Sequence, residues 1–321
     1  MTAVRRPFGL RIGALLQLFV FFLTALVWAG LALFAPRFLT AHNITNILRQ
    51  VSIVSVIAFG ELFTVIIAGI DLTVGSLAAL SGVVLAVLVA AGVPLALAIL
   101  AGLLVGAVVG LINGIGTFRL GIPAFIITLA GLEAYRGVAL LVSGGLSIAK
   151  LPPSFSNFGS AVTAGIPNLF LVTLIVGLIA DFVLRYTRTG RYLFAIGSSE
   201  EAARRAGISV GTVTVLAYVV SGVLAAVGGI LLVARLSVGS PTAATGYELQ
   251  AIAAAVVGGA SLFGGRGSIF GTFIGALLFA TIGNGANLLG IDPFWEMVAE
   301  GVLIALVVYI DNVQKRRYAG G

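Results

Sequence analysis

The chain has 321 residues, of which 60% are hydrophobic and 9% are charged, and its formal net charge is +7. A soluble domain of this length cannot bury so much apolar surface, so its solvent must be lipid. The absence of cysteine and the single histidine, His42, exclude disulfides, thiolate chemistry and a histidine-cluster metal site. We therefore expect an all-α polytopic membrane protein in a lipid bilayer. Its basic charge follows from topology and does not indicate nucleic-acid binding.

Apolar segments of about 20 residues predict the membrane spans in chain order. Ten spans are expected, and residues 1–321 are taken as one transmembrane domain. The third and fourth spans lie within an uncharged stretch that has a hinge near Gly92, Val93 and Pro94. The eighth is short, and a re-entrant helix is its alternative. The predicted spans cover residues 12–35, 50–70, two spans within 72–118, 123–142, 167–184, 212–234, 248–259, 268–289 and 293–310.

Basic residues predict the orientation of these spans because cytoplasmic loops carry an excess of lysine and arginine. With both termini in the cytoplasm, the cytoplasmic side receives Arg5, Arg6, Arg11, Arg119, Arg185, Arg188, Arg191, Arg204, Arg205, Arg266, Lys315, Arg316 and Arg317. The outer side receives only Arg37, Arg49, Lys150 and Arg235, and Arg136 falls within a span. The first span is too long for a secretion signal and is expected to remain as an anchor.

Two segments of the chain resemble each other and predict an inverted repeat. Residues 102–125 read GLLVGAVVGLINGIGTFRLGIPAF, and residues 271–294 read GTFIGALLFATIGNGANLLGIDPF. Because five spans separate the copies, they would face opposite ways across the bilayer, as repeats do in many transporters. Chance similarity is the alternative. Glycines spaced by four residues predict close helix packing in both regions. They are Gly102, Gly106, Gly110 and Gly114, and Gly267, Gly271 and Gly275.

Ionisable residues inside the spans are candidates for function because they are costly to insert into lipid. Glu133 and Arg136 are three residues apart and predict a neutralising pair, with substrate contact as the alternative. Glu61 has no partner nearby in the sequence and is expected to line an aqueous path. Asp71 and Glu248 stand where a carboxylate can accept backbone N–H bonds at the start of a helix. Together with amides that would offer weak polar contacts, the predicted translocation pathway comprises Glu61, Asp71, Asn113, Glu133, Arg136, Asn284 and Asn287.

A short polar helix is predicted at residues 198–207, which read SSEEAARRAG. Ser198 and Glu201 have the spacing of a capping box, and Gly207 is placed to end the helix in a left-handed conformation. Two ion pairs are expected on its surface, Glu200–Arg204 and Glu201–Arg205. A rigid helix with a small apolar face favours docking into a partner protein, and an isolated loop helix is the alternative.

The chain carries no recognisable machinery for hydrolysing ATP. Neither lysine, Lys150 or Lys315, lies in the G-K-[ST] context of a phosphate-binding loop. No nucleophile is paired with a base, so we do not expect an enzyme. If transport is driven by ATP, a second polypeptide binds ATP–Mg and supplies the energy, and this chain holds no cofactor.

Four segments resemble, in the same order, the permease subunits of bacterial ribose/xylose/arabinose-type ABC importers. They are GIDLTVGSLAALSG (69–82), PAFIITLAGLEAYRGVALLVSGG (123–145), GRYLFAIGSSEEAARRAGISV (190–210) and GYELQAIAAAVVGGASLFGGRGSIFGTFIGALL (246–278). The resemblance covers nearly the whole chain from about residue 45. It departs from the family at Gln250, where members often have an acidic residue.

The resemblance implies an importer in the bacterial cytoplasmic membrane that moves a monosaccharide by alternating access. The implied partners are a second permease subunit, identical or paralogous, a cytoplasmic ATP-binding cassette subunit, and a periplasmic or lipid-anchored sugar-binding protein. The loop at 185–211 would hold the coupling helix. Its expected coupling residues are Ser198, Ser199, Glu200, Glu201, Arg204, Arg205 and Gly207. The alternatives are a nucleoside or another small polar solute, an ATP-independent secondary transporter, and a scaffold that moves no solute.

Overall fold

The structure is a computed structural model that describes residues 8–292, 294–295, 297–299, 301–302, 305 and 309. Its helices are α1 (Phe8–Phe34), α2 (Ala41–Ile66), α3 (Val74–Ala90), α4 (Leu95–Phe118), α5 (Ala124–Ser143), α6 (Pro153–Ser160), α7 (Asn168–Tyr186), α8 (Arg188–Ser198), α9 (Glu200–Arg205), α10 (Val210–Leu236), α11 (Tyr247–Val257) and α12 (Ile269–Leu288). Two short strands, β1 (Val162–Thr163) and β2 (Ile166–Pro167), form an antiparallel hairpin between α6 and α7. The chain is therefore mainly helical, as predicted.

Six of the described helices are long and apolar enough to cross a membrane: α2, α4, α5, α7, α10 and α12. Shorter apolar helices are the stretch Val20–Phe34 of α1, together with α3 and α11. Half of the predicted tenth span at 293–310 lies outside the described residues. So do the predicted topogenic residues Arg5, Arg6, Lys315, Arg316 and Arg317, and the side chain of Arg11. The total of ten spans therefore stays a prediction.

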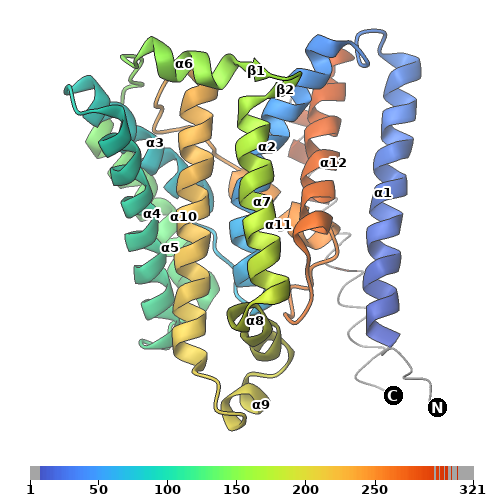
Figure 1. The fold of residues 1–321 in the computed structure, drawn as a ribbon, viewed down its shortest axis with the longest axis vertical. Coiled ribbons are helices and arrows are strands. Elements are labelled where there is room, and N and C mark those ends of the chain that lie inside the picture. The colour runs from blue at the N-terminus through green and yellow to red at the C-terminus, as the bar shows by residue number, and fades with distance from the viewer. Residues whose placement is uncertain are drawn as a thin grey trace.

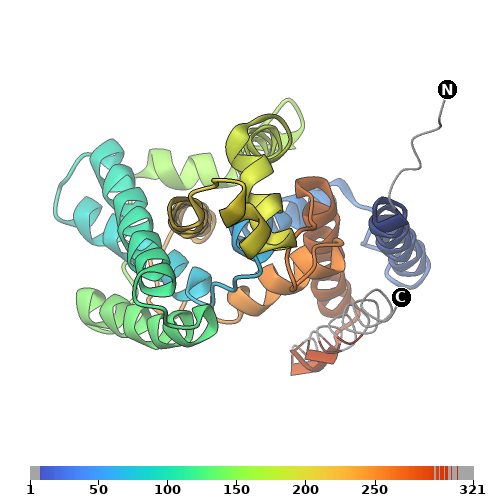
Figure 2. The same cartoon turned by 90° about the horizontal axis from the view of Figure 1, so that it is seen from below.

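The helices form a bundle with α6 and the hairpin at one end and α8 and α9 at the other (Figure 1). Viewed from the α9 end, α2 lies inside this bundle, and α4, α5 and α7 lie on its periphery (Figure 2). Every residue of α2 from 51 to 66 is buried, because α10, α11, α12 and α7 pack around it. The peripheral helices instead expose leucines such as Leu104, Leu129 and Leu178. Such apolar outer faces are suited to contact with lipid.

Two helices start inside the bundle. α3 has 17 residues and α11 has 11, which gives lengths of about 26 Å and about 17 Å, less than a bilayer core of about 30 Å. The irregular segments that precede them, 67–73 and 237–246, contain Ala68 at φ 60° and Gly246 at φ 86°. We call these two segments the first and second breaks. The eighth predicted segment is thus confirmed as short, and α11 alone does not span a membrane.

Glycines set the spacing between the central and peripheral helices. A Cβ atom at Gly106 would lie 2.4 Å from the carbonyl oxygen of Gly222, and one at Gly110 would lie 2.3 Å from that of Tyr218. Both contacts join α4 to α10. On the other side, a Cβ atom at Gly275 of α12 would lie 2.1 Å from the carbonyl oxygen of Ala254 in α11. The predicted packing role of the glycine series is confirmed, because no larger residue fits at these distances.

Most predicted boundaries agree with the structure to within a few residues, but three features differ. α2 begins at Ala41 because the hydroxyl of Thr40 accepts the backbone N–H of Asn43 at 3.3 Å. α6 and the hairpin lie in a stretch that was predicted as a loop between spans. The loop at 185–211 contains two helices, α8 and α9, where one was expected.

Candidate functional site

A cluster of buried polar side chains surrounds the first break. Glu61 of α2 and Asp71 are both fully buried, and Glu61 Oε1 accepts the backbone N–H of Asp71 at 3.0 Å. Asp71 Oδ1 accepts the backbone N–H of Thr73 at 3.0 Å and its hydroxyl at 2.5 Å. Asp71 Oδ2 accepts the hydroxyl of Ser221 from α10 at 2.9 Å. Asp71 thus accepts a backbone N–H next to a helix start, as expected, but this N–H belongs to the N-cap residue Thr73 and not to the first turn of α3.

The cluster extends to α4 and α5. The side-chain amide of Asn113 donates to the hydroxyl oxygen of Thr73 at 3.0 Å, and the hydroxyl of Tyr135 donates to Asn113 Oδ1 at 3.3 Å. Glu61, Asp71 and Asn113 are therefore brought together, although their sequence positions did not indicate it. Among the described residues, no lysine or arginine forms an ion pair with either carboxylate, and Glu61 Oε2 has no hydrogen-bond partner.

The structure corrects one expectation for Glu61. Its side chain is fully enclosed by protein, so in this conformation it does not line an open aqueous path. The reason is that α2 is the central helix and that the first break folds back onto the Glu61 carboxylate. A buried carboxyl group with one unpartnered oxygen is costly in a low-dielectric interior. Such a group is expected where function requires it rather than where it stabilises the fold.

The second break is held by Arg136 of α5. Its Nη1 atom donates to the carbonyl oxygens of Pro241 at 2.8 Å and Ala243 at 2.7 Å. Glu133, in contrast, is exposed, and the two side chains form no ion pair, so the predicted Glu133–Arg136 pair is wrong. The two residues face different ways because Arg136 turns toward the break while Glu133 lies on the outer face of α5.

The starts of α3 and α11 meet at Glu248. Its Oε1 atom accepts the backbone N–H of Gly246 at 3.1 Å, which is the capping role predicted for this residue. A Cβ atom at Gly75 of α3 would lie 2.0 Å from Glu248 Oε2 and 2.7 Å from the carbonyl oxygen of Ala244. Only glycine therefore fits at position 75. The sequences at the two places are similar, but GIDL at 69–72 lies before α3, whereas GYEL at 246–249 begins with the N-cap residue of α11 and continues into that helix.

One helix, α5, is bonded to both breaks. Thr128 donates its hydroxyl to the carbonyl oxygen of Ile70 in the first break at 3.2 Å, and Arg136 donates to the second break. Thr128 is buried and Arg136 is half-buried, and they stand eight residues apart on the same side of α5. Any movement of α5 relative to the bundle would therefore strain both irregular segments at once.

Asn284 and Asn287, two further predicted pathway residues, lie elsewhere, near the start of α2 and the end of α12. Asn284 and Asn43 exchange two amide hydrogen bonds of 2.9 Å and 2.8 Å. Asn287 is exposed and lines a polar pocket of about 270 Å³ that also includes Asn46 and Arg235. The predicted pathway set is thus divided between a buried cluster at the breaks and an amide-rich pocket at the α6 end of the bundle.

The polar helix α9 projects from the opposite end (Figure 1). Ser199, and not Ser198, caps it, because Ser199 Oγ accepts the backbone N–H of Ala202 at 3.2 Å. Ser198 ends α8 and donates its hydroxyl to the carbonyl oxygen of Phe194 at 2.8 Å, so the predicted capping box is wrong by one residue. The physical reason is that α8 continues through Ser198, which places the extended N-cap residue one position later.

The surface of α9 is as predicted. Arg204 pairs with Glu200 at 2.6 Å and Arg205 pairs with Glu201 at 2.5 Å, and these four side chains are between 57% and 78% exposed. The chain leaves the helix at Gly207, whose φ is 80°. Because the charges are satisfied within the helix, α9 presents a rigid polar surface that projects from the bundle.

The segment before α9 contacts the core of the bundle directly. Gly197 of α8 lies against the last residue of α2, since a Cβ atom there would be 1.8 Å from the carbonyl oxygen of Ile66 and 2.5 Å from the backbone nitrogen of Gly265. Gly265 itself donates to the Ile66 carbonyl at 2.8 Å. The first break begins at the next residue, so a displacement of α8 acts on the backbone that leads to Asp71.

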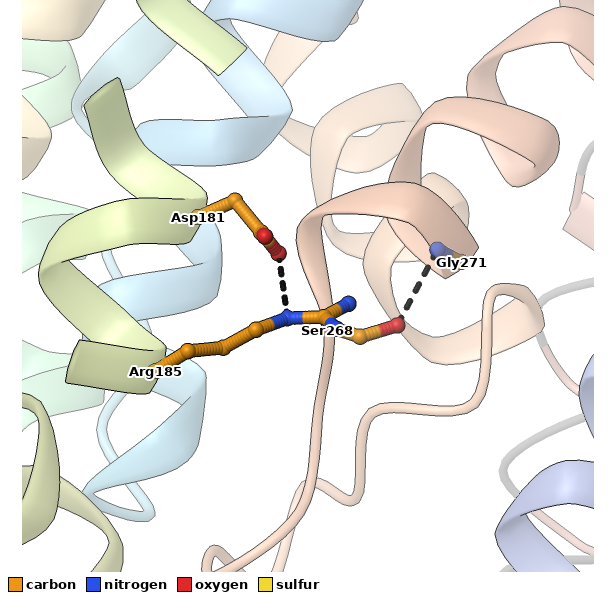
Figure 3. Close-up of polar contacts among 4 residues, drawn as sticks. All are labelled: Asp181, Arg185, Ser268 and Gly271. Carbon is orange, nitrogen blue, oxygen red and sulfur yellow. Dashed lines mark hydrogen bonds and ion pairs between the residues drawn. The ribbon is translucent and has the colours of Figure 1, made fainter. Parts of the chain in front are cut away.

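Two further polar contacts lie at the end of α7 and at the start of α12, near the α8 end of the bundle (Figure 3). Arg185 of α7 pairs with Asp181 at 2.8 Å, and its side chain extends toward Ser268, which precedes α12 (Figure 3). Ser268 Oγ accepts the backbone N–H of Gly271 at 3.1 Å and so caps α12. The first contact lies within α7 and the second at the start of α12, and these two helices pack against each other.

Comparisons with known proteins agree with this architecture. The family model described as branched-chain amino acid transport system / permease component matches residues 43–308. The ribose import permease protein RbsC of Escherichia coli (strain K12) is 41% identical over 282 residues, which are 87% of this chain and 88% of that protein. The D-allose transport system permease protein AlsC of the same strain is 40% identical over 295 residues, covering 91% and 90%.

A more distant relative is the xylose transport system permease protein XylH of Haemophilus influenzae, which is 33% identical over 342 residues and covers 87% of this chain and 91% of its own. No solved structure matches the chain. The matched region contains both breaks, α5 and the α8–α9 segment. With its apolar helices, its two buried breaks and a family match that spans most of its length, the chain belongs to the branched-chain amino acid transport system permease family.

Proposed function

We propose that the chain is the membrane-spanning permease subunit of an ATP-driven importer for a monosaccharide and that it works by alternating access. The names of its relatives, which include ribose, allose and xylose permeases, support a monosaccharide as the solute. The structural observation that carries the proposal is the pair of short helices, α3 and α11, whose starts meet inside the bundle at Glu248. Discontinuous helices of this kind are typical of transporters, where they form solute sites near mid-membrane.

The proposal includes an inverted repeat within a ten-span topology. α4 and α12, which contain most of the two similar segments, run in opposite directions (Figure 1). α3 packs against α4 and α10, and α11 packs correspondingly against α12 and α2. The similar GIDL and GYEL sequences, of which the first lies before α3 and the second at the start of α11, add a second correspondence. Under this proposal both termini lie in the cytoplasm of a bacterium, on the side of α9.

Of the residues predicted from sequence, the proposed pathway keeps Glu61, Asp71, Asn113, Arg136, Asn284 and Asn287, and it leaves out Glu133 because that side chain is exposed on the outer face of α5. The structure has the cluster at Glu61 closed to solvent, which fits one end state of an alternating cycle. In the other state, movement of α5 would open the breaks to which Thr128 and Arg136 bind. Weak polar contacts suffice here because the solute must leave the site as readily as it enters.

We propose that α9 couples this movement to a separate ATPase. The chain has no G-K-[ST] sequence, so ATP–Mg would be bound by a cytoplasmic ATP-binding cassette subunit. A second permease copy or paralogue and a sugar-binding protein on the outer side complete the proposed assembly. The contact of Gly197 with Ile66 supports a direct mechanical route from α9 through α8 to the first break.

The experiment is reconstitution of the chain with its ATPase in liposomes, followed by measurement of ATP-dependent ribose uptake. The double variant Arg204→Glu, Arg205→Glu is expected to abolish uptake and ATPase association. The matched double variant Arg204→Lys, Arg205→Lys keeps both charges and is expected to retain them. If the charge-reversed protein still transports and still binds the ATPase, the coupling role is wrong.

A parallel arm tests the alternatives. The chain alone, in liposomes with a proton or sodium gradient, is expected to accumulate no sugar. Accumulation without the ATPase would establish a secondary transporter instead. Competition of ribose uptake by unlabelled xylose, allose or a nucleoside then defines the solute class, and inhibition by the nucleoside alone would contradict the monosaccharide assignment.

A further inference from the structure

A groove of about 500 Å³ lies where the end of α4 meets α9 and the start of α10. We divide its lining into an apolar half, formed by side chains of α4, and a polar half, to which the end of α4, α9 and the start of α10 contribute. The apolar half includes Leu111, Ile115 and Phe118, and the polar half includes Arg119, Arg204 and Thr212. The proposed pathway residues do not line this groove, so it is a separate feature of the molecule.

The apolar half continues onto the outer face of α4. Leu100, Leu104 and Val108 are 51%, 55% and 53% exposed, and they lead at helical spacing to Leu111 in the groove. In a helix long and apolar enough to cross a membrane, such a row contacts hydrocarbon chains. An acyl chain lying along α4 would therefore reach the groove from within the bilayer.

The polar half carries positive charge that the described protein does not neutralise. Arg119 is exposed, and its side chain makes no ion pair or hydrogen bond with any described residue. Arg204 uses one nitrogen for Glu200 at 2.6 Å, which leaves further guanidinium N–H groups for another acceptor. The first turn of α10 adds backbone N–H groups at the same place. The hydrogen bonds within this helix begin with the N–H of Val213, which donates to the carbonyl oxygen of Ser209 at 3.2 Å, so N–H groups before Val213 point out of the helix start.

We propose that this groove binds one anionic phospholipid, with its phosphate at Arg119 and Arg204 and an acyl chain against Leu111 and Ile115. Charge complementarity selects this occupant, because a basic pocket at the end of a membrane-spanning helix fits a lipid phosphate above an apolar wall. Arginine is suited to the role because its planar guanidinium can bind phosphate through two parallel hydrogen bonds. The lipid would rest against α9 and hold it beside α10.

The test uses the full chain, delipidated in detergent, without the ATPase or any sugar, so that its result does not depend on the transport function. Phosphatidylglycerol and phosphatidylcholine with identical acyl chains are titrated separately, and bound lipids are counted by native mass spectrometry. One phosphatidylglycerol is expected to bind more tightly than any phosphatidylcholine. The variant Arg119→Gln should weaken that binding about fivefold, the factor for one arginine near a membrane surface.

Matched variants separate the alternatives. Arg191→Gln removes another exposed arginine that does not line the groove and should leave lipid binding unchanged. Leu111→Trp narrows the apolar half and should weaken phosphatidylglycerol binding without a change in charge. Equal binding of the two lipids, or unchanged binding in Arg119→Gln, overturns the proposal. So does full displacement of the bound lipid by equimolar glycerol phosphate, which would identify a phosphate site and not a lipid site.

Discussion

The contact between Gly197 and the end of α2 gives the sharpest test of how α9 acts on the bundle. In the variant Gly197→Ala, the added methyl group would lie 1.8 Å from the carbonyl oxygen of Ile66 and 2.5 Å from the backbone nitrogen of Gly265. Both are backbone atoms, which cannot rotate away as a side chain can. A normal contact needs more than 3 Å, so α8 must retreat from α2 by about 1 Å or more.

This displacement has an energetic and a functional consequence. Overpacking of this kind destabilises a protein by about 1–3 kcal/mol, which lowers Tm by several degrees. Because α8 links α9 to the first break, we also expect a loss of coupling. In liposomes that contain the ATPase, ATP hydrolysis should persist while sugar uptake falls by at least tenfold.

The control is Gly137→Ala in α5, where a Cβ atom would meet nothing within 4 Å. This variant is expected to keep normal uptake and to gain up to about 1 kcal/mol from helix propensity. The reasoning is refuted if Gly197→Ala has the Tm and the uptake of the unmodified protein. It is also refuted if uptake and ATP hydrolysis fall in parallel, because that result indicates general damage and not uncoupling.

Three further predictions concern the polar contacts. Asp71→Ala leaves several buried hydrogen-bond donors without an acceptor and should destabilise the protein by about 2–4 kcal/mol. Thermal unfolding in detergent measures this loss of stability. An unchanged stability would mean that water replaces the carboxylate. Arg136→Met should reduce uptake at least fivefold because it removes the donor of both hydrogen bonds to the second break. Glu133→Gln, by contrast, should leave uptake unchanged. Equal effects of the two variants would contradict the assigned contacts. In a double-mutant cycle, Asn43→Leu and Asn284→Leu should each lower the free energy of unfolding by about 1–3 kcal/mol. The double variant should lose less than the sum of the two single losses. Strictly additive losses would exclude a hydrogen bond between the two amides.

The sequence predicts the helices of this protein well because lipid simplifies the problem. A span must be apolar over about 20 residues, and helix ends are marked by Pro94 and Gly207. The ion pairs of α9 are equally local, since each joins residues four apart. Such features depend only on the spacing of residues along one helix, which can be taken directly from the sequence.

The site was predicted less completely because its contacts are made between distant segments. Arg136 was expected to pair with its sequence neighbour, but its partners are the carbonyl oxygens of residues 241 and 243. Every residue has a backbone carbonyl group, so the sequence does not indicate which carbonyl oxygens Arg136 binds. The similarity of GIDL and GYEL gives a partial sequence signal for the contact between Gly75 and Glu248. It is much shorter than the similarity between residues 102–125 and 271–294.

The hydrogen bond from Ser221 to Asp71 joins residues 150 positions apart. During synthesis, α2 and α3 therefore enter the bilayer long before α10 exists to receive the Asp71 carboxylate. Until then the first break carries a carboxylate and free backbone groups in hydrocarbon, where they are unfavourable. The N-terminal half of the chain therefore cannot complete this polar cluster until α10 of the C-terminal half has been inserted beside it.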